Sequence, residues 1–316
     1  MLNDFRRYLT TERRYSPLTV RNYIRDVERF VAWWSETSGE PFDAAKVDRD
    51  HLREWIVWRS EEGEGKAPAG HHAKLKAASL NRELCSLRAY FRFLTRRGVI
   101  AKDPAHAIAA LRTPKRLPSF VPETRMETIV DRCRDTAEDF ETLRDRLIVV
   151  FFYATGLRLA ELVAIDVDDF SDDWRSLRVV GKGDKERLVP ILDPLVDQIL
   201  AYRDAISRQQ ICKSGEKALF LTCKGVRVSR SKVYRVVQKA LQEGGVQGKK
   251  SPHVLRHTFA THLMNAGADM REIQELMGHS SLQSTQVYTH NSIARLSEVY
   301  AVAHPRQRTE KGTKKE

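Results

Sequence analysis

Two histidines and an arginine lie close together in the segment SPHVLRHTFATHL, which covers residues 251–263. His253 and His257 are four residues apart, a spacing at which two histidines on one helical face can bind zinc. His253 and Arg256 are three residues apart, a spacing at which donors on successive turns can hold a phosphate. The segment therefore allows two kinds of site, a zinc centre or an anion-binding site.

The neighbouring residues favour the phosphate site. Ser251 is a typical N-cap and Pro252 suits the first helical position, so we expect a helix that extends to about Asn265. Free N–H groups in its first turn and the helix dipole would attract an anion. Arg256 would repel a zinc ion, and no glutamate follows His253 as in the zinc motif H-E-x-x-H. Zinc remains the weaker alternative.

Two more cations lie in segments that can approach a ligand. In ATGLRLAELVAI, Arg158 begins a helix directly after a glycine, and Glu161 is placed three residues later to hold its guanidinium. In VVGKGDKERLVPI, Lys182 lies between two glycines on a predicted turn, where a loop can come close to a ligand. From spacing alone, Arg158 also fits a surface salt bridge, and Lys182 also fits a solvated turn.

A further histidine and a tyrosine follow a predicted helix end. The helix in ADMREIQELMG ends at Gly278, which places His279 at its exit, and Tyr288 comes nine residues later. Alone, this pair indicates little about chemistry.

The composition predicts an intracellular protein with a polyanionic partner. The 316 residues carry a net charge of +12, with 21 Lys and Arg against 15 Asp and Glu in residues 1–112 and 33 against 27 in the remainder, so each part has a charge of +6. Such charge suits nucleic acid, although it also serves solubility alone. No signal peptide or membrane-spanning run is present, which predicts a cytoplasmic protein without membrane insertion. The four scattered cysteines form no C-x-x-C pair, so we expect reduced thiols.

Periodicity divides the chain into two domains. Residues 1–112 predict four helices in a small bundle, with an exposed Gly- and Ala-rich loop at 61–77. Prolines mark a linker at 113–122. The second domain, 123–304, is helical except for a β-hairpin with strands at 177–180 and 187–191. The basic tail, 305–316, is predicted to be disordered.

Four segments carry a resemblance to a known family. TGLRLAEL, GKGDKERLVP, HVLRHTFATHL and LMGHSSLQSTQVYTH stand in the order found in the tyrosine recombinase (phage integrase) family, and the chain most resembles its Xer site-specific recombinases. The resemblance implies a mainly α fold, with an N-terminal four-helix (SAM-like) core-binding domain and a C-terminal α/β catalytic domain that contains a small antiparallel sheet. The 61–77 loop is longer than expected of a compact Xer N-terminal domain.

The resemblance also assigns roles to six residues. Tyr288 would be the nucleophile, Arg158 and Arg256 would hold the scissile phosphate, and Lys182 would be the general acid for the leaving 5′ oxygen. His253 and His279 would donate hydrogen bonds to the phosphate and assist proton transfer. Paired arginines can supply the charge that a metal ion supplies elsewhere, so we expect neither metal nor cofactor nor ATP.

The implied function is site-specific recombination of duplex DNA through a 3′-phosphotyrosyl intermediate, which would resolve chromosome dimers at cell division. The partners would be a double-stranded recombination site and a homo- or hetero-tetramer, the latter with a paralogous recombinase, on two duplexes. We expect no arm-binding domain before residue 1, which would favour a Xer protein over the larger integrases. The alternatives are the integrase of a mobile element and a non-catalytic DNA-binding module.

Overall fold

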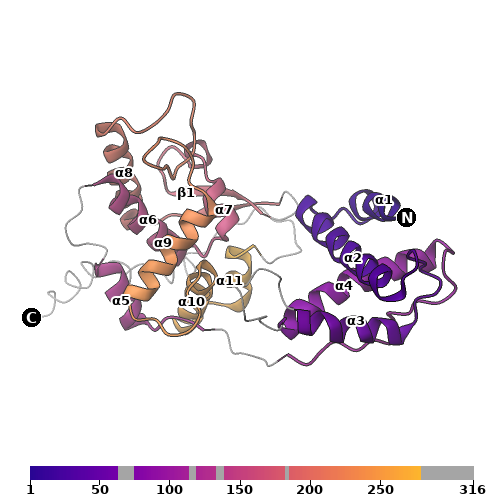
Figure 1. The fold of residues 1–316 in the computed structure, drawn as a ribbon. Coiled ribbons are helices and arrows are strands. Elements are labelled where there is room, and N and C mark those ends of the chain that lie inside the picture. The colour runs from indigo at the N-terminus through magenta and orange to yellow at the C-terminus, as the bar shows by residue number, and fades with distance from the viewer. Residues whose placement is uncertain (63–74, 114–118, 133–138, 182–184, 279–316) are drawn as a thin grey trace, which may run out of the picture. The chain divides into compact units, whose positions relative to one another are not determined.

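The computed structural model describes residues 1–62, 75–113, 119–132, 139–181 and 185–278. The chain forms two compact units, Met1–Arg116 and Leu117–Glu316 (Figure 1). Within the described ranges, no helix combines the length and the apolar character that crossing a membrane requires.

The first unit is built from helices, as the sequence predicts. They are α1 (Leu2–Arg7), the π-helical turn η1 (Tyr8–Glu12), α2 (Pro17–Ser38), α3 (Arg49–Glu62) and α4 (Ala77–Arg96). Ser16 caps α2, because its hydroxyl accepts the N–H of Thr19 at 3.3 Å. The apolar stripe of α2 is buried and α2 packs against α4, so the predicted four-helix core is present.

Two buried carboxylates tie the helices of the first unit together. Asp26 on α2 accepts two hydrogen bonds from Arg82 of α4, at 2.6 and 3.2 Å. Glu83 of α4 accepts from Arg59 of α3 at 3.0 Å and from Arg29 of α2 at 2.8 Å. Since a buried carboxylate without its cation is strongly unfavourable, these pairs fix the register of α2, α3 and α4.

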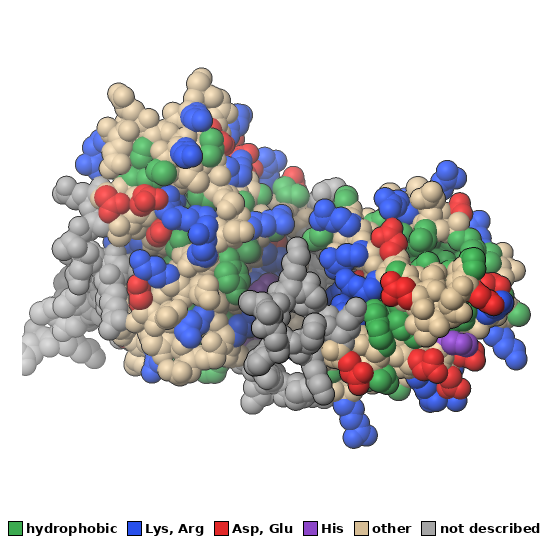
Figure 2. All heavy atoms as spheres, in the orientation of Figure 1, with side chains coloured by type: hydrophobic (Ala, Val, Ile, Leu, Met, Phe, Trp, Pro, Cys, Tyr) green, Lys and Arg blue, Asp and Glu red, His purple; other side chains and the backbone are tan. Residues whose placement is uncertain are grey.

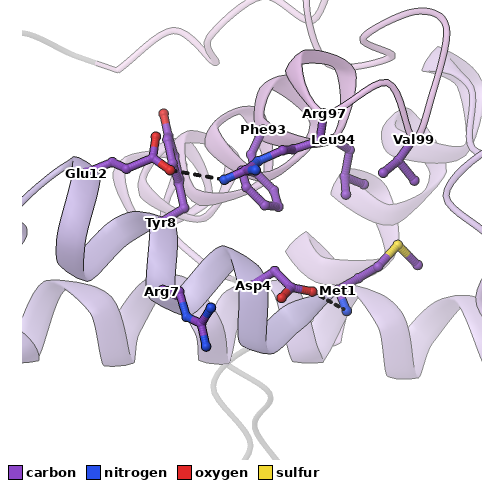
Figure 3. A pocket seen from close by; sticks show the side chains of 9 residues that line it. All are labelled: Met1, Asp4, Arg7, Tyr8, Glu12, Phe93, Leu94, Arg97 and Val99. Carbon is purple, nitrogen blue, oxygen red and sulfur yellow. Dashed lines mark hydrogen bonds and ion pairs between the residues drawn. The ribbon is translucent and has the colours of Figure 1, made fainter.

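A surface pocket lies between the N-terminal helices and the end of α4 (Figure 3). Its lining residues are Met1, Asp4, Arg7, Tyr8, Glu12, Phe93, Leu94, Arg97 and Val99. The Met1 ammonium lies 3.2 Å from Asp4, and Arg97 lies 3.1 Å from Glu12. These four charges are therefore neutralised in pairs at the rim of an apolar floor.

The second unit surrounds one buried helix. Its elements are α5 (Glu123–Arg132), α6 (Phe140–Thr155), α7 (Leu159–Ala164), the 3-10 turn η2 (Val167–Asp169), β1 (Ser176–Val180), β2 (Glu186–Pro190), α8 (Asp193–Arg208), α9 (Arg230–Glu243), α10 (Pro252–Asn265) and α11 (Met270–Leu276). Every residue of α6 from Leu147 to Thr155 is buried, and α8, α9 and α10 pack around it (Figure 1). A helix that is apolar on all sides is expected at the centre of a domain.

Helix α6 ends in a turn that only glycine fits. Gly156 is left-handed, with φ of +60°, and its N–H donates to Phe152 O at 3.0 Å. A Cβ at Gly156 would lie 2.3 Å from Cδ1 of Phe259 on α10. The turn therefore brings α10 close to the segment that begins α7.

Strands β1 and β2 form the predicted hairpin. They pair antiparallel from Ser176 opposite Pro190 to Val180 opposite Glu186, within one residue of the predicted ends. Gly181 N–H donates to Lys185 O at 2.8 Å and closes the base of the turn. The mainly helical fold with a small antiparallel sheet is confirmed.

Replacing Gly156 with alanine should destabilise the second unit by about 3 kcal/mol, because the side chain would clash with Phe259 and strain the backbone. Gly215→Ala is the matched control, since its φ is +82° but no atom lies within 4 Å of the added Cβ. Gly215→Ala should lower the free energy of unfolding by about 1 kcal/mol, because only the left-handed backbone conformation is strained. Calorimetric unfolding measures both variants, and equal shifts in midpoint would contradict the clash.

Candidate active site

Three of the six predicted site residues lie in the described part of the chain. Arg158 is the N-cap of α7, and His253 and Arg256 lie in the first turns of α10. Lys182, His279 and Tyr288 lie outside the described residues.

Arg158 is held by a buried carboxylate, as the spacing predicts. Its Nη1 donates to Glu161 Oε1 at 2.7 Å, and its backbone N–H donates to Oε2 of the same residue at 2.9 Å. The Glu161 side chain is 5% exposed whereas that of Arg158 is 35% exposed. The carboxylate therefore anchors the cation at a point where the guanidinium still reaches solvent.

Arg256 is a buried cation that contacts carbonyl oxygens. Its Nη1 donates to Gly156 O at 2.5 Å and its Nη2 to Met277 O at 2.6 Å. Within the described ranges, no carboxylate lies close enough to form an ion pair with it. Burial, and then the nearby positive charges of Arg158 and Arg187, lower its pKa to about 10, and Glu161 offsets part of this effect. Arg256 is thus charged at neutral pH, and its hydrogen-bond partners among the described residues are neutral carbonyl groups.

Arg187 joins this cluster, although the sequence reasoning missed it. Its Nη2 and Nη1 donate to Glu161 Oε2 and Oε1 at 2.8 and 3.2 Å, and its Nε donates to Leu276 O at 3.0 Å. The alternation of residues along β2 could have indicated Arg187. Arg187 is two residues before buried Val189 and so lies on the same face of β2, where a charge needs a partner.

The charges of Glu161 and its neighbours are strongly coupled. Burial is the largest influence on Glu161 and would raise its pKa, but the hydrogen bonds from Arg187 and Arg158 oppose it and lower the pKa to about 2. Three guanidinium charges against one carboxylate leave a net charge of 3 − 1 = +2 in the cluster. Such a surplus at a partly desolvated position favours an anion.

The end of α11 is bound to all three arginines. Leu276 O accepts from Arg187, and Met277 O accepts from Arg256. Gly278 O accepts from Arg158 Nη2 at 3.3 Å. These carbonyls belong to the group that a helix leaves unpaired at its C-terminus, where the helix dipole is negative. The next residue in the sequence is His279.

The hairpin turn also begins beside the cluster. A Cβ on Gly181 would lie 3.6 Å from Arg187 Nη1 and 3.7 Å from Glu161 Oε1. Lys182 is the next residue along the chain. Of the described residues that immediately precede Lys182 and His279, Gly181 therefore lies beside Arg187 and Glu161, and Gly278 is hydrogen-bonded to Arg158.

The histidines of α10 have different environments. His253 is exposed in the first turn, His257 is half-buried, and His262 is buried with its Nδ1 2.9 Å from the Tyr153 hydroxyl. The described residues contain no group of three or more His, Cys, Asp or Glu side chains arranged to hold a metal ion. The three described cysteines, Cys85, Cys212 and Cys223, are free and exposed.

Comparison with known proteins identifies the family. Residues 119–295 match the phage integrase family, and residues 2–98 match the phage integrase N-terminal SAM-like domain. The chain is 38% identical to the tyrosine recombinase XerC of Pelobacter propionicus over 311 residues, which covers 98% of this chain and 96% of that one.

The chain belongs to the phage integrase family. It is also 35% identical to the tyrosine recombinase XerD of Mycobacterium leprae, with 96% of each chain covered. Its fold resembles that of the XerH recombinase in a post-cleavage complex with difH DNA, with a TM-score of 0.68, 20% identity and coverage of 95% of this chain and 84% of that one. The fold also resembles that of the Tn1549 transposon integrase in complex with transposon right end DNA, with a TM-score of 0.65, 19% identity and coverage of 95% of this chain and 99% of that one.

The depressed pKa of Glu161 predicts a stability change in acid. Its folded-state pKa of about 2 is below the ordinary 4.5, so the stabilisation is complete above pH 4.5 and is lost as the pH falls through 2. Between pH 6 and 3.5 the wild type should lose about 1 kcal/mol more than Glu161→Gln, which has no carboxylate to titrate. Urea unfolding at each pH measures the difference, and parallel pH dependence of the two proteins would exclude the buried ion pair.

Proposed function

We propose that this chain is a tyrosine site-specific recombinase that cuts and rejoins duplex DNA. One observation supports this most strongly: Arg158 and Arg256 converge on the Gly156 turn within a cluster that has a surplus of two positive charges. Phosphoryl transfer requires positioning and charge stabilisation above all. A phosphodiester carries one negative charge, and its five-coordinate transition state carries a second, which matches the surplus.

The proposed reaction conserves the energy of the phosphodiester bond. The Tyr288 hydroxyl gives up its proton, a transfer that His253 and His279 assist, and its oxygen attacks the scissile phosphorus. A new P–O bond forms, and the bond to the 5′ oxygen breaks. Lys182 gives a proton to that leaving oxygen, while Arg158 and Arg256 bind the non-bridging oxygens. The 5′ hydroxyl of a second strand then attacks the 3′-phosphotyrosyl ester, so resealing needs no ATP. His253 and His279 donate hydrogen bonds to the phosphate.

The proposed biological role is that of a Xer recombinase. The relatives named XerC and XerD align over nearly the whole chain, which favours this role over that of a mobile-element integrase. Both halves of the sequence are basic, and lysine and arginine side chains occur on both units in the face drawn in Figure 2. We therefore propose a cytoplasmic protein that holds duplex DNA with both units and acts as a tetramer, alone or with a paralogue, in resolving chromosome dimers.

Tyr288→Phe should abolish covalent attachment to DNA and leave DNA affinity within a few-fold of wild type, since only the attacking oxygen is removed. The tagged wild type is incubated with fragmented host chromosomal DNA and denatured in detergent, and the DNA that remains attached is sequenced to define the site. A wild-type protein that retains no DNA would refute the proposed function. An adduct that persists in Tyr288→Phe would place the nucleophile elsewhere.

Lys182→Ala should cleave slowly because the 5′ oxygen leaves without a proton. A substrate with a 5′-bridging sulfur has a better leaving group that needs little acid, so it should restore cleavage by Lys182→Ala. Arg256→Ala should not recover, because its defect lies in charge stabilisation. Rates of adduct formation on oxygen and sulfur substrates measure both effects, and equal rescue of the two variants would remove Lys182 from the acid role.

A further inference from the structure

Arg187 differs from the other two arginines of the cluster in how its donors are used. All three of its guanidinium nitrogens donate to protein atoms, two hydrogen bonds going to Glu161 and one to Leu276 O. Its side chain is 12% exposed, against 35% for Arg158. Arg187 therefore has little capacity to bind a substrate directly.

The same contacts connect three segments that carry proposed site residues. Through Glu161, Arg187 reaches Arg158 at the start of α7. Through its own strand it belongs to the hairpin whose turn contains Lys182. Through Leu276 O it reaches the end of α11, two residues before the described chain ends at Gly278. Gly278 itself lies so close that a Cβ there would be 3.0 Å from Arg187 Nη1.

Binding of a phosphate would require some of the arginine N–H groups to change hydrogen-bond partners. Arg158 and Arg256 also donate to the carbonyls of Gly278 and Met277. Under the proposed function both arginines must direct N–H groups at the phosphate. The hydrogen bond from Arg158 to Gly278 O, at 3.3 Å, is longer than the hydrogen bond from Arg256 to Met277 O, at 2.6 Å. The bond from Arg187 to Leu276 O needs no such rearrangement, because the three guanidinium nitrogens of Arg187 already donate to Leu276 O and Glu161.

We propose that Arg187 is a positioning residue for the strand-transfer reaction, which holds Glu161 and the end of α11 in place while Arg158 and Arg256 bind the scissile phosphate. This inference rests on the proposed function. Arg187 also neutralises Glu161, so that Arg158 is anchored without the full negative charge of the carboxylate opposing the phosphate. Loss of Arg187 would leave the buried Glu161 with Arg158 as its one directly bonded cation among the residues that the structure describes.

The test compares Arg187→Gln with Arg178→Gln, an exposed arginine on the neighbouring strand that pairs with Asp169 and Glu186. The substrate is a synthetic duplex with the sequence attached to the wild type, nicked so that cleavage cannot reverse. Arg187→Gln should lower the single-turnover cleavage rate about 100-fold, the effect of a small misplacement of reacting groups. Its affinity for the uncleaved duplex should stay within about threefold of wild type, because ground-state contacts are kept. Arg178→Gln should cleave at the wild-type rate.

The pH profile separates positioning from a general loss of structure. Among the described residues, the charged groups facing Glu161 are Arg158 on α7, Arg187 on β2 and Arg256 on α10. Without Arg187, burial raises the pKa of Glu161, and a protonated Glu161 holds Arg158 less well. The cleavage rate of Arg187→Gln relative to wild type should therefore fall as the pH is lowered from 8 to 5.5. In Glu161→Gln/Arg187→Gln this ratio should be independent of pH, since the titrating group is gone.

Several outcomes would overturn the proposal. Cleavage by Arg187→Gln within threefold of wild type would show that the contacts do not serve the reaction. Equal losses of affinity and cleavage, with a pH-independent ratio, would assign Arg187 to folding alone. Both results presuppose an active wild type, so they are distinct from failure of the proposed function, in which the wild type itself forms no adduct.

Discussion

The site of this protein depends on one buried carboxylate. Glu161 lies where α7, the β-hairpin and the end of α11 meet, and two arginines donate to it. Burial alone would raise its pKa, whereas the two guanidinium groups hold the pKa near 2. The interaction therefore works in both directions, because the arginines keep the acid ionised and the ionised acid keeps the arginines in place.

The rest of the second unit supplies the rigidity that this arrangement needs. Helix α6 is buried from Leu147 to Thr155 and is capped by Gly156, whose carbonyl accepts a hydrogen bond from Arg256. Phe259 packs on the same glycine, so α10 cannot shift without disturbing the start of α7. Arg256 donates to the carbonyl oxygens of Gly156 and Met277, and within the described part of the chain it has no carboxylate partner, so its burial is costly.

Much of this arrangement could be predicted from the sequence because local rules determine it. Spacing of three residues paired Arg158 with Glu161, the Ser-Pro start located α10, and the change of period located the hairpin within a residue. Arg187 escaped because its partners, Glu161 and Leu276, are 26 and 89 residues away in the chain, and no local spacing reports such contacts. The same limit applies to the hydrogen bonds at the end of α11, in which Arg158, Arg187 and Arg256 each donate to a carbonyl that is distant in the sequence. The roles of all six site residues, Arg158, Lys182, His253, Arg256, His279 and Tyr288, remain predictions.

The mutual dependence of Glu161 and Arg187 has a consequence for how such proteins diverge. Changing Glu161 alone leaves the buried Arg187 without its carboxylate partner, and changing Arg187 alone removes a cation bonded to the buried Glu161. A lineage that loses one of the pair therefore passes through a less stable intermediate or replaces both. Exposed positions on the hairpin, such as Val180, carry no such constraint and are free to drift. We therefore expect substitutions to be distributed unevenly over these two short strands among related sequences. Residues on the inner face should change together, whereas residues on the outer face should change independently.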